Sequence, residues 1–424
     1  MKFEPSLHKL SSGLTVILDP MDLETINFKV HFNTGSRDEK PNEYGLTHFC
    51  EHMLCKGTPR FPDKKSIDDY FDYYSGARNA LTGVSKLEFY GRILAENTDK
   101  LIDYIGDQLQ NSLFDPQKLE IERDVVKDEL RRALDSPIRQ FGDFISKNLF
   151  DYATFSSRNL GTEETLQSFN RKQAMDFIYG RMSAKNCIIC ASGKIENKDA
   201  LLKYIEKTFA FLPTFDVPEN KEINYTPGVF HNSKPDNKNV RLNILFTDKC
   251  GNRFEDRYEN RCVAKFETYI ARELNKIIRH ENGLAYGFGM VAYGNEDFDI
   301  NGFATETASK NIEKCVALIA HNAFRIYNEN KIAADDLDRF NRKNKLKQAD
   351  FLESSSSRCD KLIQFYRDYD RLYNFSEDIK LSESATVDDV IKYSRGYFDG
   401  PVSIITQGED FDADLGAVWA ENFK

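Results

Sequence analysis

The chain has 424 residues, of which 40% are apolar and 30% charged, so it can bury a sizeable core and is not intrinsically disordered. At about 150 residues per domain, this length predicts two or three domains, with two preferred. The formal net charge of −10 argues against a general nucleic-acid-binding protein, which needs a basic surface.

Strands and helices alternate along the first half of the chain. The segments 14–18 and 26–32 are β-branched or alternate apolar with polar residues, which predicts an opening strand pair. Apolar residues at helical spacing predict helices over 43–56, 65–75, 97–112, 116–134, 170–181 and 197–209. The apolar run 186–192 predicts a buried strand that ends at Gly193.

The composition changes between Pro213 and about Asn239. Prolines and polar residues replace the periodic pattern there, so we expect an inter-domain linker over 214–238. The predicted domains on either side are 1–213 and 239–424.

The second half repeats the plan of the first at a separation of about half the chain. A predicted strand ends at Gly408 as another ends at Gly193. Leu337 in IAADDLD matches Leu119 in FDPQKLE at nearly the same separation. We therefore expect an α+β protein with two homologous α/β-sandwich domains, each a mainly antiparallel sheet covered by helices.

The eight cysteines are widely spaced, and no run of about 18 apolar residues and no apolar leader segment is found in the chain. These features predict a cytoplasmic protein with reduced thiols and no membrane segment. Cys187 and Cys190 lie three residues apart on a predicted strand, where they face opposite sides, so we expect core residues and not a metal or redox pair.

The sequence YGLTHFCEHMLCKG contains the pattern H-x-x-E-H as His48, Glu51 and His52. Four residues of helix turn the chain by about 400°, so the two histidines lie about 40° apart on one face and can converge on one metal ion. Glu51 lies on the same side and can hold a metal-bound water without being a ligand. The opposite face is apolar, as expected of a helix packed on a core.

A catalytic zinc site usually has three protein ligands, and Glu129 is the best candidate for the third. It lies on the predicted helix 116–134, which begins with Asp115 as N-cap and Pro116 as first residue. Glu122 is seven residues earlier and shares its face. One of the two glutamates can ligate zinc while the other orients a ligand's ring N–H.

These residues resemble the pitrilysin and mitochondrial-processing-peptidase family of inverted zincins. Glu129 follows His52 at the spacing found in that family. NTGSRDEKPNEYGLTHFCEHMLCKGTPRFP resembles the family's metal helix, ARNALTGVSKLEFY its Asn-Ala-x-Thr edge strand, and LEIERDVVKDELRRALDSP its third-ligand helix. The resemblance covers nearly the whole chain.

The resemblance implies a zinc endopeptidase that cleaves peptides or short unfolded segments inside a chamber. It implies one Zn²⁺ per chain, with His48, His52 and Glu129 as ligands and Glu122 orienting a ligand. Glu51 would take a proton from the zinc-activated water and deliver it to the leaving amine. Asn79 and Ala80 would lie on the strand that receives the substrate as an added strand.

A second signature lies in the other half, where Arg279 and Tyr286 are seven residues apart. This spacing resembles the family's Arg/Tyr pair, which binds the substrate carbonyl and stabilises the oxyanion. In family members of this size a partner subunit supplies the pair, so the resemblance implies a homodimer. The second half lacks H-x-x-E-H, and Lys347 falls opposite Glu129, as expected of a metal-free copy.

Other interpretations stay open at this stage. Glu122 and Glu129 can be solvated helix residues, Arg279 a cation at a helix C-terminus, and Tyr286 a sheet aromatic. The whole chain can be a non-catalytic peptide-binding or processing-complex subunit, or a zinc hydrolase of non-peptide substrates on a related fold. Cys50 and Cys55 depart from the family, which usually has larger apolar residues there, and Cys55 would lie nearer the metal and could make the site sensitive to oxidants.

Overall fold

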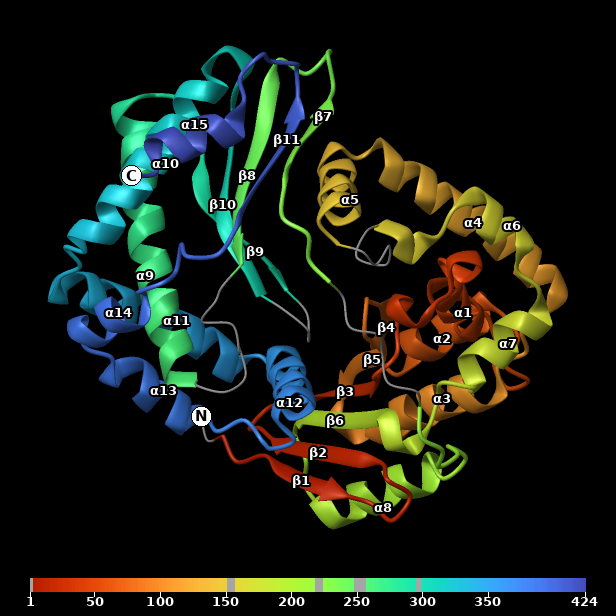
Figure 1. Cartoon of the computed structure of the whole chain (residues 1–424). Helices are drawn as coiled ribbons and strands as arrows, with labels where there is room; N and C mark the ends of the chain where they lie inside the picture. The colour runs from red at the N-terminus through yellow and green to blue at the C-terminus, as the bar shows by residue number, and fades with distance from the viewer. Residues whose placement is uncertain (1–2, 151–156, 218–223, 248–256, 295–298) are drawn as a thin grey trace. The chain divides into compact units, whose positions relative to one another are not determined.

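The computed structural model describes residues 3–150, 157–217, 224–247, 257–294 and 299–424. The chain forms two compact units, each with its own sheet (Figure 1). The first unit comprises Met1–Ser146, Tyr152–Glu222 and Gln348–Tyr373, and the second comprises Lys147–Asp151, Ile223–Lys347 and Asn374–Lys424. A membrane-spanning helix, with the length and apolar character that this requires, is not found among the described residues.

The first unit contains a six-stranded sheet in the order β1-β2-β6-β3-β5-β4. Its strands are β1 (Ser6–Lys9), β2 (Thr15–Pro20), β3 (Thr25–Phe32), β4 (Ala77–Thr82), β5 (Leu87–Leu94) and β6 (Cys187–Gly193). The predicted pairing of segments 14–18 and 26–32 is wrong, because β6 lies between β2 and β3, parallel to one and antiparallel to the other. Every residue of β6 is buried, which suits the apolar run to a central strand.

The six helices predicted in the first half are present among the described residues, together with two helices that were not predicted, over 137–149 and 163–168. They are α1 (Leu46–Leu54), α2 (Lys64–Tyr73), α3 (Thr98–Asn111), α4 (Pro116–Asp135), α5 (Pro137–Leu149), α6 (Glu163–Ser168), α7 (Arg171–Tyr179) and α8 (Lys198–Thr208). The start of α4 is confirmed, since the Asp115 carboxylate accepts hydrogen bonds from the backbone N–H groups of Gln117 and Lys118. The predicted helix 43–56 is shorter, because Gly45 has a left-handed backbone with φ of 88° and α1 begins after it.

The helix α1 packs on one face of the first sheet through its apolar side. Phe28 and Val30 of β3 point into the same core as Leu46, Phe49 and Met53 of α1, and all five side chains are fully or almost fully buried. This packing leaves the polar face of α1 free to carry a site.

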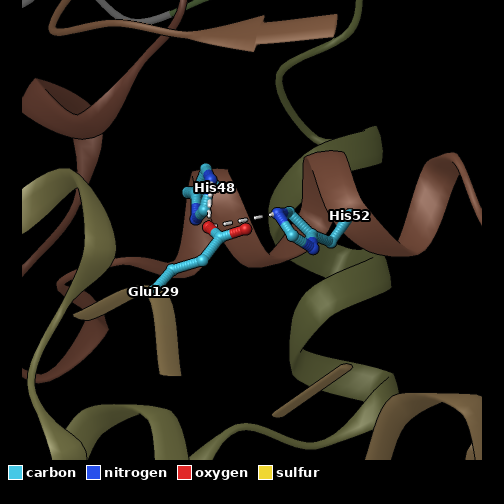
Figure 2. A group of neighbouring side chains, drawn as sticks. All are labelled: His48, His52 and Glu129. Carbon is cyan, nitrogen blue, oxygen red and sulfur yellow. Dashed lines mark ion pairs between the residues drawn. The ribbon is translucent and has the colours of Figure 1, made fainter. Parts of the chain in front are cut away.

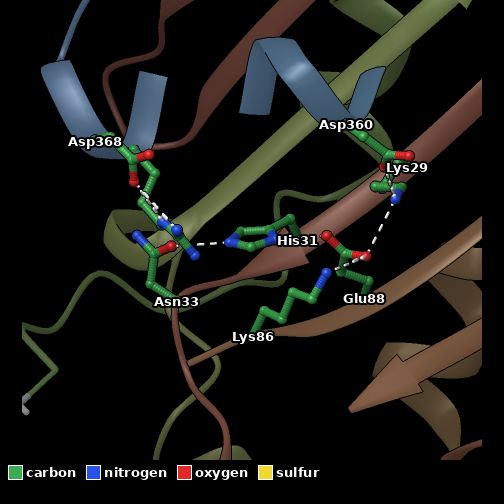
Figure 3. A network of polar contacts seen from close by, with 8 residues as sticks. Lys29, His31, Asn33, Lys86, Glu88, Asp360 and Asp368 are labelled. Carbon is green, nitrogen blue, oxygen red and sulfur yellow. Dashed lines mark hydrogen bonds and ion pairs between the residues drawn. The ribbon is translucent and has the colours of Figure 1, made fainter. Parts of the chain in front are cut away.

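The other face of the first sheet is polar and is covered by α12 (Ser355–Tyr369) from the second half of the chain. Arg358 forms an ion pair with Asp19, and both side chains are fully buried. Lys29 of β3 pairs with Glu88 at 3.1 Å and also with Asp360 of α12 (Figure 3). A helix from the predicted second domain therefore belongs to the first compact unit. The compact units differ in extent from the predicted homologous domains 1–213 and 239–424, whose boundaries remain a prediction.

The second unit contains a five-stranded sheet in the order β7-β11-β8-β10-β9. Its strands are β7 (Val229–Ser233), β8 (Asn239–Thr247), β9 (Phe288–Gly294), β10 (Asp299–Ala308) and β11 (Val402–Gly408). The strand β7 lies inside the predicted linker 214–238 and is an edge strand of this sheet, whereas residues 218–223 of that linker lie outside the described residues. The other helices of the second half are α9 (Arg257–Asn275), α10 (Ile312–Glu329), α11 (Ala334–Glu353), α13 (Phe375–Ser384), α14 (Val387–Tyr393) and α15 (Leu415–Asn422).

The two sheets have the same topology. The order β7-β11-β8-β10-β9 repeats β2-β6-β3-β5-β4, and in both sheets the first pair is parallel and the others are antiparallel. Gly193 and Gly408 end equivalent strands with φ of 143° and 154°. At each, a Cβ atom would lie within 2.3 Å of a backbone oxygen, that of Thr25 or of Asn239, so glycine is required at both. The predicted α+β fold with two related domains is confirmed, with mixed sheets.

Candidate metal centre

Two histidines and one glutamate converge beside α1. The Nε2 atoms of His48 and His52 lie 3.7 and 3.8 Å from Oε2 of Glu129, which reaches them from α4 (Figure 2). The donor atoms of the three residues all lie within 4.8 Å of one another. Among the residues that the structure describes, this is the one group of histidine, cysteine and acidic side chains with such spacing.

The spacing of these donors suits a shared metal ion. Distances of 3.7 and 3.8 Å are too long for hydrogen bonds. Zinc bonds of about 2.0–2.2 Å place two ligands of a tetrahedral site roughly 3.3–3.5 Å apart, close to the observed separations. Burial, with the charges of His52 and Arg139, lowers the pKa of His48 to about 3, so its imidazole is neutral and can donate a lone pair.

Glu122 lies behind His52, on the side away from Glu129. Its Oε2 is 3.0 Å from Nδ1 of His52, and its Oε1 is 2.7 Å from the ammonium group of Lys56. Burial raises the pKa of Glu122, but the hydrogen bonds from His52 and Lys56 outweigh it, so the pKa is below its usual value. An ionised Glu122 fixes the tautomer of His52 with its proton on Nδ1 and leaves Nε2 free to bind a metal.

Glu51 points to the same region from the neighbouring position on α1. The Thr82 hydroxyl of β4 donates a hydrogen bond of 2.5 Å to Oε2 of Glu51. Burial raises the pKa of Glu51, while the Thr82 hydrogen bond and the charge of His52 act in the opposite direction. A carboxylate with a raised pKa, held in place by a hydroxyl, is suited to accept a proton near neutral pH.

The start of α1 is held by a buried carboxylate that the sequence analysis did not identify. Glu39 accepts hydrogen bonds from the backbone N–H groups of Gly45 and Thr47, at 2.8 and 2.7 Å. A Cβ atom on Gly45 would lie 2.6 Å from the backbone of Gly161, so the chain can approach this closely only through glycine. The turn of helix that carries His48 therefore has a fixed starting point.

Two further residues that the sequence analysis missed are Thr82 and Lys56. Thr82 is the last residue of the Asn-Ala-x-Thr pattern, and the two-residue period of a strand places it on the same face as Ala80. The strand period could therefore have identified Thr82 from the sequence. The ion pair of Lys56 with Glu122 joins segments far apart in the sequence, and no local pattern indicates it.

The strand β4, which carries Asn79 and Ala80, lies at the edge of the first sheet. It pairs with β5 on one side, with Asn79 opposite Tyr90 and Ala80 opposite Phe89. The backbone N–H of Ala80 donates to the side-chain oxygen of its neighbour Asn79 at 3.0 Å. Because β4 ends the sheet, its other side is the one where an added strand would pair.

Arg279 and Tyr286 lie next to each other in the second unit. Arg279 belongs to a π-helical turn, Lys276–Glu281, that extends α9. Tyr286 precedes β9, so the alternative that it is a sheet aromatic is wrong. The guanidinium carbon of Arg279 is 5.2 Å from the centre of the Tyr286 ring. Tyr286 is 90% exposed, so its hydroxyl is accessible to a ligand and is not part of a core.

Both cysteines near α1 are free thiols, and Cys50 is buried while Cys55 is partly buried. Cys50 donates to the backbone oxygen of Ala174, and Cys55 accepts a hydrogen bond from the Gln108 amide at 3.0 Å. Burial, with the nearby charge of Glu51, raises the pKa of Cys55 to about 12, so it is protonated at neutral pH. The seven described cysteines are free, and Cys250 lies outside the described residues.

Two sequence-family models match the chain. Residues 19–163, which contain His48, His52 and Glu129, match the family described as insulinase, peptidase family M16. Residues 168–343, which contain Arg279 and Tyr286, match the peptidase M16 inactive domain. The chain belongs to peptidase family M16. This confirms the resemblance to pitrilysin and the mitochondrial processing peptidases that the sequence analysis identified.

Relatives in the M16 family carry names of proteases. A protein of Rickettsia bellii named an uncharacterized zinc protease is 29% identical over 326 residues, which is 76% of this chain and 77% of the relative. An Arabidopsis thaliana protein named a probable mitochondrial-processing peptidase subunit beta is 25% identical over 232 residues, which is 54% of this chain and 43% of the relative.

Solved M16 structures share the fold at low sequence identity. A protease from Helicobacter pylori has a TM-score of 0.80 and 18% identity, covering 96% of this chain and 100% of that one. A peptidase M16 inactive domain from Pseudomonas fluorescens has a TM-score of 0.83 and 14% identity, covering 97% and 99%. At this identity the likeness concerns the fold alone.

Proposed function

We propose that this M16 protein is a zinc-dependent endopeptidase that hydrolyses peptides or short unfolded segments. Its family and the zinc proteases among its relatives support a peptidase in general. The observation that carries the finer proposal is the convergence of His48, His52 and Glu129, whose spacing and chemistry fit one Zn²⁺ per chain.

A zinc ion at these ligands would supply a Lewis acid that polarises the scissile carbonyl and lowers the pKa of a water molecule. The chain's own residues do the rest. Glu51 accepts the proton of the attacking water and later delivers it to the leaving amine. Thr82 holds the Glu51 carboxylate through its 2.5 Å hydrogen bond, and Glu122 keeps His52 in the tautomer that binds metal.

The proposed substrate pairs with the edge strand β4 as an additional strand. The edge position of β4 supports this, and an extended peptide can replace the bond between the Ala80 N–H and the Asn79 side chain with one from its own carbonyl. Main-chain pairing requires an extended segment, which a folded protein does not offer. Peptides and unfolded segments are therefore the proposed substrate class.

Arg279 and Tyr286 are proposed to bind the substrate carbonyl and stabilise its developing negative charge. A guanidinium beside an exposed phenol offers two hydrogen-bond donors in one place, which supports this role. Following the family resemblance, we propose that the pair acts across the interface of a homodimer.

The experiment is cleavage of a mixed peptide library by wild type and by Glu51→Gln, each with its zinc content measured. We expect Glu51→Gln to retain zinc and lose cleavage, because the amide cannot accept the proton. Glu43→Gln, a partly exposed glutamate nearby whose carboxylate accepts the backbone N–H of Lys40, is the matched control and should cleave normally. Cleavage by zinc-loaded Glu51→Gln would contradict the mechanism, and absence of cleavage by wild type would favour a non-catalytic peptide-binding subunit.

A further inference from the structure

The second unit contains a cavity of about 340 Å³ between α9, α11 and β9. Its polar lining includes Lys265 and Arg272 from α9 and Asp336, Arg339 and Lys343 from α11. Four cations and one carboxylate thus face one cavity, in a chain whose net charge is −10. A local excess of positive charge in an acidic protein indicates an anionic ligand.

The single carboxylate of the lining is already engaged. Asp336 forms an ion pair of 2.8 Å with Arg272 and also accepts the backbone N–H of Ala333. Arg272 has a second carboxylate partner, Glu273, at 2.7 Å. These contacts neutralise Arg272 and leave the other three cations without a carboxylate from the lining.

Lys265 is the most unusual of these three cations, because only 2% of it is exposed. Among the described residues its ammonium group contacts a neutral acceptor, Oδ1 of Asn341 at 2.6 Å, and the face of the Phe340 ring at 4.3 Å. Burial lowers the pKa of Lys265 to about 8. A buried ammonium group paired with no carboxylate is costly unless an anion joins it.

Arg339 and Lys343 extend this positive charge to the mouth of the cavity. They are four residues apart on α11 and therefore share a face of the helix. Both are exposed, and within the described part of the chain neither forms an ion pair with a carboxylate. Their side chains can move onto a ligand at little cost, since no ion pair has to break.

The rest of the cavity wall is mostly apolar, with Thr268 and Asn275 as its uncharged polar members. Phe288 and Met290 of β9 face Tyr269 of α9 and Phe340 of α11 around it. A fully hydrated small anion gains nothing from such a wall, whereas a ligand with an apolar group next to its negative charge contacts both parts.

The duplication gives this cavity a counterpart in the first unit. The elements α9, β9 and α11 correspond by sheet topology and chain order to α1, β4 and α4, which surround the metal centre. The alignment that matches Leu119 with Leu337 also matches Glu122 with Phe340. The second copy therefore has a cationic and aromatic cavity where the first has metal ligands.

We propose that this cavity binds the C-terminal end of a peptide. The terminal carboxylate lies against Lys265, Arg339 and Lys343, and an apolar last side chain packs on Phe288 and Phe340. This rests on the proposed function in one respect, that the protein handles peptides. The copy that lacks metal ligands thereby keeps a peptide-binding role.

The test uses the full chain, treated with the neutral chelator 1,10-phenanthroline so that no peptide is cleaved. Fluorescence anisotropy measures binding of a labelled peptide that ends in Phe, either as the free acid or as the C-terminal amide. We expect the free acid to bind about tenfold more tightly, as one charge-assisted contact allows. Arg339→Ala with Lys343→Ala should reduce this preference severalfold without affecting amide binding, because Lys265 remains.

Lys345→Ala is the matched control, because it removes an exposed cation of α11 that does not line the cavity. It should keep the preference for the free acid. Equal binding of acid and amide to wild type, or an unchanged preference in the double variant, overturns the proposal. Displacement of the labelled peptide by a nucleotide, with no preference for the free acid over the amide, also overturns the proposal. Because binding is measured without cleavage, a failed peptidase assay and a failed cavity assay are distinguishable.

Discussion

Nδ1 of His52 lies 3.0 Å from Oε2 of Glu122, while Nε2 of the same ring lies 3.8 Å from Oε2 of Glu129. The buried Glu122 carboxylate therefore orients the ring, and the Glu129 carboxylate lies on the side of the ring that we propose faces the metal. His48 differs, since its Nδ1 has no hydrogen-bond partner among the described residues. Of the two proposed histidine ligands, His52 therefore has a carboxylate that orients its ring, and His48 has no such partner among the described residues.

Glu122→Gln should weaken zinc binding by about 10- to 100-fold, because the ring of His52 loses its ionised partner. Zinc affinity is measured by competition with a chromophoric chelator. Glu120→Gln, an exposed neighbour on α4 that pairs with Arg123, serves as the control and should bind zinc like wild type. Equal affinities of Glu122→Gln and wild type would show that Glu122 does not orient a ligand.

Thr82→Val should lower kcat about tenfold with zinc content unchanged, because Glu51 loses the hydroxyl that holds it. Thr82→Ser keeps the hydroxyl and should restore most of the rate. Steady-state kinetics and metal analysis on the same samples separate these effects. A loss of zinc in Thr82→Val, or no rescue by serine, would mean that Thr82 acts on the fold of β4 and not on Glu51.

The polar layer under α12 should make the protein sensitive to acid (Figure 3). Burial alone would raise the pKa of Glu88, but the His31 hydrogen bond and the charges of Lys29 and Lys86 bring it down to about 2, from the usual 4.5. Above pH 4.5 Glu88 is ionised whether the chain is folded or unfolded. Between pH 4.5 and 2 the unfolded chain takes up the proton first, so the free energy of unfolding falls as the pH falls.

This contribution is on the order of 3 kcal/mol and is lost entirely below about pH 2. Glu88→Gln should be less stable at pH 7 but should lose less stability on acidification. Urea unfolding at a series of pH values from 7 to 3 measures both quantities. Parallel pH profiles for the two proteins would be inconsistent with a depressed pKa of Glu88.

Mixing inactive chains tests the proposed homodimer. Glu51→Gln and Arg279→Ala are each expected to be inactive alone, but a mixed dimer would contain one complete site if Arg279 acts on the partner's zinc. Random 1:1 mixing should then restore about a quarter of wild-type activity. Native mass spectrometry confirms that mixed dimers form. Mixed dimers without activity, or a protein that is monomeric at assay concentration, would contradict the proposal that Arg279 acts across an interface.

Much of the first unit could be predicted from sequence because its signals are local. The helix α4 has an Asp115 cap, Pro116 and apolar periodicity, and it begins where these place it. The strand pairing could not be predicted, since β6 enters between β2 and β3 from a distant part of the chain. Periodicity reports burial and not the identity of the neighbouring strand.

In the candidate site too, local spacing could be predicted and contacts between distant segments could not. Spacing along one helix places His48 and His52 together, whereas the choice between Glu122 and Glu129 needs the relative position of α1 and α4. The docking of α12 on the first sheet depends on Asp19 and Arg358, which come from opposite ends of the chain. No pattern in either segment indicates its partner.

The most direct test of the account is the zinc content of the purified full chain after zinc loading and dialysis, measured by mass spectrometry of the metal. Wild type and the control Asp124→Asn, an exposed residue of α4, should hold one zinc per chain, and Glu129→Gln should hold much less. A wild-type chain that retains no zinc, or a Glu129→Gln chain that retains as much as wild type, would contradict the central claim.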